Sequence, residues 1–374
     1  MDVSSDNSVA KLSKNIIKVA RGLFTEAERQ REFLDAIQRG DSSLTAVVWL
    51  KESDDRSACG TSGRPEWLPE WIDVAAVGQR PGKLPEHERG DIYCMDLSST
   101  FACSPFSEIE TPIGVVLDVC ASPGGKGIVA RRYLSPDLLV GNEVIGKRTA
   151  QLISNYKRCG IDPAIVTSLD PEILGRELAG CADLVIVDAP CSGQSLVLKG
   201  MAAPGAFHPA TIGMNERRQR RILAHSAKSV AAGGYLLYAT CTFSREENEG
   251  NLEWFLKNFS EFSTVPVEAL AGYRSHLSHV CCYRLWPNAG KGAGAFCALL
   301  RRSGEVGQRE RITSDAVAAK LRTAWRSPAR FISEPKGALG SAPSKRDNRR
   351  KDDAKRRSKR YERHKAKRIV RDFT

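Results

Sequence analysis

The sequence lacks the features of several classes of protein. No apolar run approaches the about 18 residues that a membrane-spanning helix needs. The start, MDVSSDNSVAKLSK, is polar with early acidic residues, unlike a signal or transit peptide. The 11 cysteines include no paired C-x-x-C with histidines at ligand distance, so we expect no metal site. We therefore expect free thiols, no membrane contact and a cytoplasmic location, or the nucleus or nucleolus if the source is eukaryotic.

Positive charge is concentrated at the C-terminal end. From Arg301 onward there are 24 Lys and Arg against 9 Asp and Glu, whereas residues 1–300 carry 32 against 35. A nearly neutral body with a basic tail predicts a polyanionic partner, most simply nucleic acid. Residues 341–374 have almost no large apolar side chains, so we expect residues 303–374 to form a disordered tail that orders on a polyanion. A solvated or localising tail without a role in substrate binding is an equal alternative.

The remaining residues divide into two predicted domains. Residues 1–90 are expected to form a small accessory α/β domain. A capping box of Thr25 and Glu28 predicts a helix near its start, and LTAVVWL at Leu44 predicts a strand. The segment PEWLPEW that follows is typical of a connector that packs on a neighbour.

Residues 91–302 alternate strands and helices, the pattern of a parallel sheet covered on both faces. A helix is predicted over residues 147–159, and another after Thr242, where Ser244 and Glu247 form a second capping box. CCYRLWP and GAFCALL are expected to add an antiparallel pair. The predicted parallel strands are IGVVLDV at Ile113, DLLVGNE at Asp137, AIVTSLD at Ala164, DLVIVDA at Asp183 and GYLLYAT at Gly234.

A glycine-rich turn follows the first of these strands. The segment DVCASPGGKG, from Asp118 to Gly127, matches neither the phosphate loop G-x-x-x-x-G-K-[ST] nor the dinucleotide fingerprint G-x-G-x-x-G. Glu143 ends the second strand 25 residues after Asp118, near the spacing at which an acid binds a ribose, and Asp170 ends the third. These residues fit an adenosine-containing ligand other than NAD or ATP, with S-adenosylmethionine as the leading candidate. A tight turn with unrelated surface carboxylates explains each feature taken alone.

Two cysteines follow the next two strands. Asp188 and Cys191 lie at the end of the fourth strand, and Cys241 lies at the end of the fifth, so the two thiols and the carboxylate should converge at one sheet edge. Free cysteines are usually inert buried residues. Cys241, however, precedes a predicted helix whose N-terminal dipole would favour a thiolate. We therefore interpret this pair as reactive.

These motifs resemble those of the Nol/Nop/Sun (RsmB/RsmF-like) family of RNA cytosine-C5 methyltransferases. DVCASPGGKG, NEVIGKR with NYKRCG, VDAPCSG and YATCTFSREENE occur in the family's order and at compatible spacing, and the resemblance covers about residues 20–302. The paired cysteines are highly specific to this family. The resemblance implies a Rossmann-like class I methyltransferase sheet, S-adenosylmethionine as cofactor and RNA as substrate, with ribosomal RNA favoured over transfer RNA. The resemblance also implies that the accessory domain of residues 1–90 is of an RNA-binding type. We also expect a monomer.

The resemblance further implies the roles of individual residues. Cytosine C5 is a poor nucleophile, so an enzyme must add a group to C6, and an activated thiolate is suited to this. Cys241 is then the nucleophile and Cys191 the base that assists release. Asp188 is expected to hydrogen-bond the cytosine N3 edge and Lys126 to orient the base. The implied cofactor-binding set is Cys120, Ala121, Ser122, Pro123, Gly124, Gly125 and Lys126 for the methionine part, Glu143 for the ribose, Asp170 for the adenine, and Arg148 and Asp188 beside them.

The sequence departs from the family's pattern at three places. Gly127 stands where threonine is common, Met95 where glutamine is common, and Gln194-Ser195 where a glycine often follows the PCSG turn. None of these changes removes a residue with an implied catalytic role. They predict altered shapes of the cofactor and base pockets.

Other readings stay open. A non-catalytic RNA-binding or ribosome-assembly factor could keep the fold, although it would have no need of two reactive thiols. A small-molecule methyltransferase would account for neither the basic tail nor the second thiol. A basic cluster, Arg217, Arg218, Arg220 and Arg221, is either a contact for RNA or, slightly favoured, a solvated helix face.

Overall fold

The computed structural model describes residues 12–40, 44–53, 56, 63–305 and 313–328. The polar N-terminal start, Cys59 and most of the predicted basic tail, residues 329–374, lie outside these ranges. The described residues all belong to one compact unit.

A three-stranded antiparallel sheet forms the accessory region. Its strands are β1 (Thr45–Trp49), β2 (Ile72–Val74) and β3 (Ile92–Asp96), in the order β2-β1-β3. The strand predicted at Leu44 is confirmed as β1. β3 follows residue 90, so this sheet draws on both sides of the boundary that the sequence suggested. The sheet is short because each strand has only three to five residues.

Two N-terminal helices, α1 (Lys14–Leu23) and α2 (Ala27–Arg39), precede this sheet. The predicted capping box of Thr25 and Glu28 is wrong, because Glu26 takes the N-cap position of α2 and makes no side-chain capping bond. The capping residues are therefore one position out of register with the helix start. Both helices bury apolar side chains against Phe243 and Trp286, so they pack beside the loop that follows Cys241.

The main sheet is mixed and has nine strands among the described residues. Its order is β10-β11-β8-β7-β4-β5-β6-β12, and β9 pairs with the far end of β11. The five strands predicted to be parallel are confirmed as β4 to β8, and the predicted antiparallel pair is confirmed as β10 and β11. The strands are β4 (Val115–Asp118), β5 (Leu138–Asn142), β6 (Ala164–Thr167), β7 (Ala182–Asp188), β8 (Val230–Thr240), β9 (Phe262–Val265), β10 (Tyr283–Leu285), β11 (Ala295–Arg302) and β12 (Thr323–Arg326).

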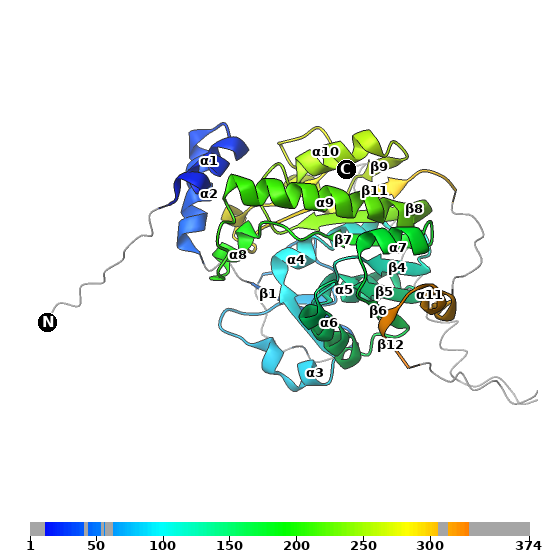
Figure 1. The fold of residues 1–374 in the computed structure, drawn as a ribbon. Helices are drawn as coiled ribbons and strands as arrows, with labels where there is room; N and C mark the ends of the chain where they lie inside the picture. The colour runs from blue at the N-terminus through cyan, green and yellow to red at the C-terminus, as the bar shows by residue number, and fades with distance from the viewer. Residues whose placement is uncertain (1–11, 41–43, 54–55, 57–62, 306–312, 329–374) are drawn as a thin grey trace, which may run out of the picture. The chain divides into compact units, whose positions relative to one another are not determined.

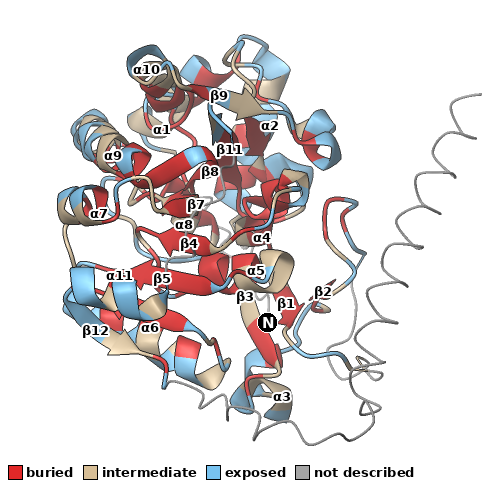
Figure 2. Ribbon diagram, turned by 90° about the vertical axis from the view of Figure 1, so that its right-hand side faces the viewer, coloured by how far each residue is buried: buried red, intermediate tan, exposed pale blue. Residues whose placement is uncertain are grey.

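Helices cover both faces of this sheet, as Figures 1 and 2 show. One buried apolar cluster joins the strands to α4, α5 and α6, and a second joins them to α7, α9 and α10. The helix predicted over 147–159 is confirmed as α6, which buries Leu152 and Tyr156. The helices beyond α2 are α3 (Pro85–Glu88), α4 (Leu97–Phe101), α5 (Gly125–Leu134), α6 (Gly146–Arg158), α7 (Pro171–Glu177), α8 (Gln194–Leu198), α9 (Pro209–Ser229), α10 (Glu249–Asn258) and α11 (Ser314–Lys320).

Part of the predicted tail is ordered. Within 313–328, α11 buries Val317, and β12 pairs with β6 in antiparallel orientation. Trp325 of β12 packs against the main core, with the Lys157 ammonium 5.9 Å from its ring centre. The segment adds β12 to the sheet as an edge strand, and its few apolar side chains pack it against the core.

The second predicted capping box is also wrong. α10 begins at Glu249, after Asn248, rather than at Ser244. Glu247 points inward instead and is fully buried. Its side chain accepts hydrogen bonds from the loops that follow β7 and β8.

A buried ion pair holds β10 against the start of α10. Arg284 is 2% exposed and Glu249 is completely buried; their Nε–Oε1 and Nη2–Oε2 distances are 2.6 and 2.5 Å. Burial alone would raise the pKa of Glu249, but Arg284 outweighs it and lowers the pKa. The cation therefore compensates a carboxylate that water cannot reach.

We predict that Arg284→Met lowers the free energy of unfolding by about 3–5 kcal/mol, because it leaves Glu249 buried without a cation. Urea denaturation measures this loss. The control Arg245→Met removes a surface pair with Glu253 and should cost less than about 1 kcal/mol. Equal losses in the two variants would contradict the assigned role of Arg284.

Candidate active site

The glycine-rich turn connects β4 to α5 at the carboxyl edge of the sheet. Gly124 adopts φ +114°, a backbone conformation that favours glycine, and the Ser122–Pro123 peptide bond is cis. A Cβ on Gly124 would lie 3.0 Å from the Leu152 side chain. The turn therefore needs glycine at this position to pack against α6.

Glu143 and Arg148 tie this turn to the end of β5. Glu143 is 3% exposed, and its Oε2 lies 3.3 Å from Arg148 Nη1. Arg148 donates to the Ser122 carbonyl at 2.7 Å, and the Ser122 hydroxyl donates to the Arg148 carbonyl at 2.9 Å. Arg148 therefore links the carboxylate and the turn that the sequence predicted to share one ligand.

Asp170 begins α7 and faces α9. Its Oδ1 accepts hydrogen bonds from the Glu172 amide at 2.9 Å and from Arg221 at 2.7 Å. The bond from Arg221 holds the pKa of Asp170 below its usual value. The carboxylate is partly exposed and remains charged at neutral pH.

The predicted basic cluster is divided between two environments. Arg218 and Arg221 line the cavity described below. Arg220 pairs with Glu216 at 2.5 Å and lies over the Trp254 ring at 5.4 Å. The cluster is thus neither one continuous contact surface nor a uniformly solvated face.

Lys126 and Asp188 form an ion pair beneath the thiols. The Nζ–Oδ2 distance is 2.7 Å, and the two side chains are 10% and 36% exposed. Burial would lower the pKa of Lys126, but the Asp188 carboxylate outweighs it and raises the pKa. Burial, with Asp188 next in importance, raises the pKa of the neighbouring Asp118 to about 7. Asp188 thus shares its surroundings with one cation and one readily protonated acid.

The two predicted thiols are in contact. β7 and β8 are parallel neighbours with Asp188 opposite Ala239, so the turns that follow them meet. The Sγ atoms of Cys191 and Cys241 are 3.3 Å apart. The hydrogen bond between them lowers the pKa of Cys241, and the same contact with burial raises the pKa of Cys191 well above its usual value. The pair therefore favours a thiolate at Cys241 and a thiol at Cys191.

One cavity of about 330 Å³ connects these groups. Seven of the predicted site residues line it: Cys120, Glu143, Arg148, Asp170, Asp188, Cys191 and Cys241. The predicted turn residues 121–126 are not among its lining residues, and Lys126 reaches the site through Asp188. Four apolar side chains that were not predicted also line the cavity: Val144, Pro171, Leu196 and Ile222. They carry no sequence signal beyond their apolar character.

The three departures from the family pattern have local packing partners. A Cβ on Gly127 would lie 2.8 Å from the Tyr156 hydroxyl, and the Met95 side chain lies 3.0 Å from where a Cβ on Gly125 would be. Gln194 is fully buried; its Oε1 accepts hydrogen bonds from the Phe243 and Ser244 amides at 2.8 and 3.1 Å. Each replacement therefore fits its surroundings in this chain.

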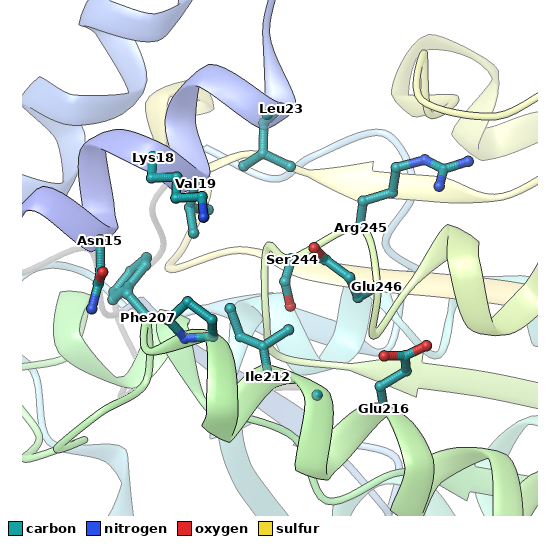
Figure 3. A pocket seen from close by; sticks show the side chains of 13 residues that line it. Asn15, Lys18, Val19, Leu23, Phe207, Ile212, Glu216, Ser244, Arg245 and Glu246 are labelled. Atoms are coloured by element: carbon teal, nitrogen blue, oxygen red, sulfur yellow. The ribbon is translucent and has the colours of Figure 1, made fainter.

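A second cavity, of about 470 Å³, lies away from the thiols. Figure 3 shows it between α1, the start of α9 and the loop from Ser244 to Glu246. Its described lining contains no predicted site residue. Its size therefore does not make it the chemical centre.

Comparison with solved structures defines the class of the fold. A structure described as a methyltransferase homolog protein from Pyrococcus horikoshii superimposes with a TM-score of 0.61 at 22% identity, over 78% of this chain and 100% of the other. The fold is a Rossmann-like methyltransferase fold.

The family follows from the sequence match. Residues 110–301, more than half of the chain, match the family model described as 16S rRNA methyltransferase RsmB/F. The chain belongs to this family, which confirms the resemblance read from the motifs.

Two curated relatives are named ribosomal RNA small subunit methyltransferase F. The one from Pectobacterium atrosepticum is 28% identical over 79% of this chain and 64% of its own length. The one from Cronobacter sakazakii is 31% identical over 64% of this chain and 51% of its own length. The chain thus spans less than two thirds of these relatives.

None of the helices in the described ranges is long and apolar enough to cross a membrane. In the same part of the chain, no group of three or more His, Cys, Asp or Glu side chains is placed to hold a metal ion.

Proposed function

We propose that this protein is an S-adenosylmethionine-dependent methyltransferase that makes 5-methylcytosine in ribosomal RNA. The observation that carries the proposal is the 3.3 Å contact between Cys191 and Cys241 at one end of a cavity that reaches Glu143 and Asp170. Membership of the RsmB/F family and the names of the curated relatives support it. The same names make us favour ribosomal over transfer RNA.

The cavity fits the proposed cofactor. Its volume of about 330 Å³ lies in the usual range for small ligands. Glu143 and Asp170 provide carboxylate acceptors for hydroxyl and amino groups, and Cys120 and Arg148 also line the cavity. The rest of the turn supports this lining through the hydrogen bonds between Ser122 and Arg148. When bound, S-adenosylmethionine supplies an electrophilic methyl group on a sulfonium.

Cys241 performs the addition step. Its thiolate, favoured by the Cys191 hydrogen bond, adds to C6 of cytosine and makes C5 nucleophilic. Cytosine N3 is a hydrogen-bond acceptor, so Asp188 binds it through a proton that the carboxyl group and N3 share. Lys126 holds the Asp188 carboxyl group at 2.7 Å. Both residues stabilise the ring while C5 accepts the methyl group.

Cys191 performs the release step. Its pKa is raised mainly by the contact with Cys241, so it falls once the Cys241 sulfur is bonded to carbon and carries no charge. Cys191 then loses its own proton to water and, as a thiolate, removes the C5 proton; this restores the double bond and expels the Cys241 sulfur as a thiolate. The close contact thus suits both halves of the reaction.

A non-catalytic ribosome-assembly factor is the rival function. It would need neither the sulfur contact nor a lowered pKa at Cys241, so we favour the enzyme. We further propose a monomer that acts without a metal, since Cys241 and Cys191 of this chain supply both proposed steps. A cytoplasmic location follows from the proposed substrate, with the nucleus or nucleolus in a eukaryote.

We predict that Cys241→Ala reduces RNA methylation by about 10³-fold or more, because the nucleophile is lost. Transfer of a radiolabelled methyl group to RNA measures the rate, and calorimetry should show that the variant still binds S-adenosylmethionine. The control Cys181→Ala removes a thiol outside the cavity lining and should keep activity. Undiminished methylation by the Cys241 variant would refute the assignment.

We predict that Cys191→Ala accumulates a covalent complex with RNA, because addition and methyl transfer proceed while release does not. A denaturing gel would show the complex as a slower band that ribonuclease removes. The double variant with Cys241→Ala should show no such band. Normal turnover without the band would remove Cys191 from the release step.

We predict that truncation after Pro328 flattens the dependence of RNA affinity on salt concentration, because the removed segment is rich in Lys and Arg. This end point keeps β12, which pairs with β6. Filter binding at several salt concentrations measures the slope. An unchanged slope would leave the tail without a role in RNA binding.

A further inference from the structure

Glu247 is a buried carboxylate above the sheet. It is completely inaccessible to solvent. It accepts hydrogen bonds from the Ser192 amide at 2.9 Å, the Ser192 hydroxyl at 2.5 Å, the Ser244 hydroxyl at 2.7 Å and Gln219 Nε2 at 2.9 Å. The Thr242 hydroxyl is a further, longer donor at 3.5 Å, and all of these donors are neutral. A buried carboxylate held in this way is costly to retain for stability alone.

These bonds join the turns that carry the two thiols. Ser192 directly follows Cys191, and its hydroxyl also lies 2.7 Å from the hydroxyl of Thr242, which directly follows Cys241. The Tyr238 hydroxyl donates to the Glu247 carbonyl at 2.5 Å and anchors this loop to β8. Glu247 therefore clamps the two turns at the separation that brings the sulfurs into contact.

A cation follows the helix that contacts the Cys241 turn. Helix α8 sits over the Cys241 turn, since the Ser195 amide donates to the Cys241 carbonyl at 3.2 Å. Lys199 follows α8, and its Nζ lies 3.2 Å from Asp96 Oδ2 at the end of β3. Both side chains of this ion pair are about 15% exposed. The accessory sheet thus fixes an ammonium beside the active site.

The charges around the pair act in opposite directions. Glu247 contributes to the raised pKa of Cys191, after the Cys241 contact and burial. Lys199 contributes to the lowered pKa of Cys241, after the Cys191 hydrogen bond and against burial and Asp188. Asp188 is already paired with Lys126, and the Tyr238 hydroxyl next to the pair is buried and neutral. Glu247 and Lys199 are therefore the charged groups that favour the thiol at Cys191 and the thiolate at Cys241, whereas Asp188 opposes the thiolate at Cys241.

We propose that Glu247 and Lys199 are positioning residues that keep the shared proton on Cys191 and the negative charge on Cys241. Glu247 acts from the Cys191 side and Lys199 from the Cys241 side. In the proposed function, this polarity decides which sulfur attacks the base. The inference rests on that function only for this consequence, since the polarity itself exists without RNA or cofactor.

The test is alkylation of the full-length protein by iodoacetamide between pH 5 and 9, without RNA or cofactor. Peptide mass spectrometry gives the labelling rate of each cysteine. In the unmodified protein, Cys241 should react first at neutral pH, because only thiolates react. We predict that Glu247→Gln lowers the ratio of Cys241 to Cys191 labelling about tenfold, the effect of a pKa change of about one.

The matched control is Glu246→Gln. Glu246 is the neighbouring residue with the same charge, but it is exposed and lines the outer cavity of Figure 3. This variant should keep the ratio of the unmodified protein. A role in stability alone would lower the melting temperature of Glu247→Gln and leave its labelling ratio unchanged, which would overturn the proposal.

Lys199→Met and Ser192→Ala give independent tests if Glu247→Gln does not fold. Lys199→Met should slow labelling of Cys241 and move its pH midpoint upward, because the nearby positive charge is lost. Ser192→Ala removes one tie of the clamp and should lower the ratio by a smaller factor. If folded Lys199→Met and Ser192→Ala proteins label like the unmodified protein, the proposal is wrong. A correct labelling pattern in a protein that never methylates RNA would instead refute the proposed function.

Discussion

The contact between the Cys191 and Cys241 sulfur atoms is the interaction on which the site depends. It arises because β7 and β8 are adjacent and parallel, so the turns after Asp188 and Thr240 leave the sheet side by side. The two Sγ atoms lie 3.3 Å apart and share a hydrogen bond, and each sulfur shifts the pKa of the other. A pair of this kind can add to a base with one member and release it with the other.

The groups around this contact make the acidities of the two thiols unequal. Glu247 accepts a hydrogen bond from the residue that follows Cys191, and Lys199 follows the helix that contacts the Cys241 turn. Asp188, which pairs with Lys126, lines the same cavity as the two thiols. Lys199 is held by Asp96 of the accessory sheet, and the N-terminal helices pack against the loop after Cys241. The accessory region therefore supports the chemical centre as well as adding surface.

The sequence allowed prediction of the features that follow from long hydrophobic strands. Five such segments predicted the parallel sheet. The motifs at the ends of these strands predicted that Asp188, Cys191 and Cys241 lie close together. Two other short strands, β2 with three residues and the edge strand β12 with four, were not predicted, because they are too short to show a hydrophobic period. Glu247 was interpreted as a capping residue, since its spacing from Ser244 fits that motif equally well. The folded structure is needed to see that the Glu247 carboxylate points inward and accepts hydrogen bonds from Ser192, after Cys191, and from Ser244, in the loop after Cys241.

Trapping the enzyme on a modified base tests the central claim most directly. RNA that carries 5-fluorocytosine at the target position has no C5 proton to remove, so the enzyme should stop after methyl transfer with the base still attached. Peptide mapping of that complex should locate the RNA on Cys241. Attachment to Cys191, or the absence of any attachment in a preparation that methylates ordinary RNA, would contradict the account.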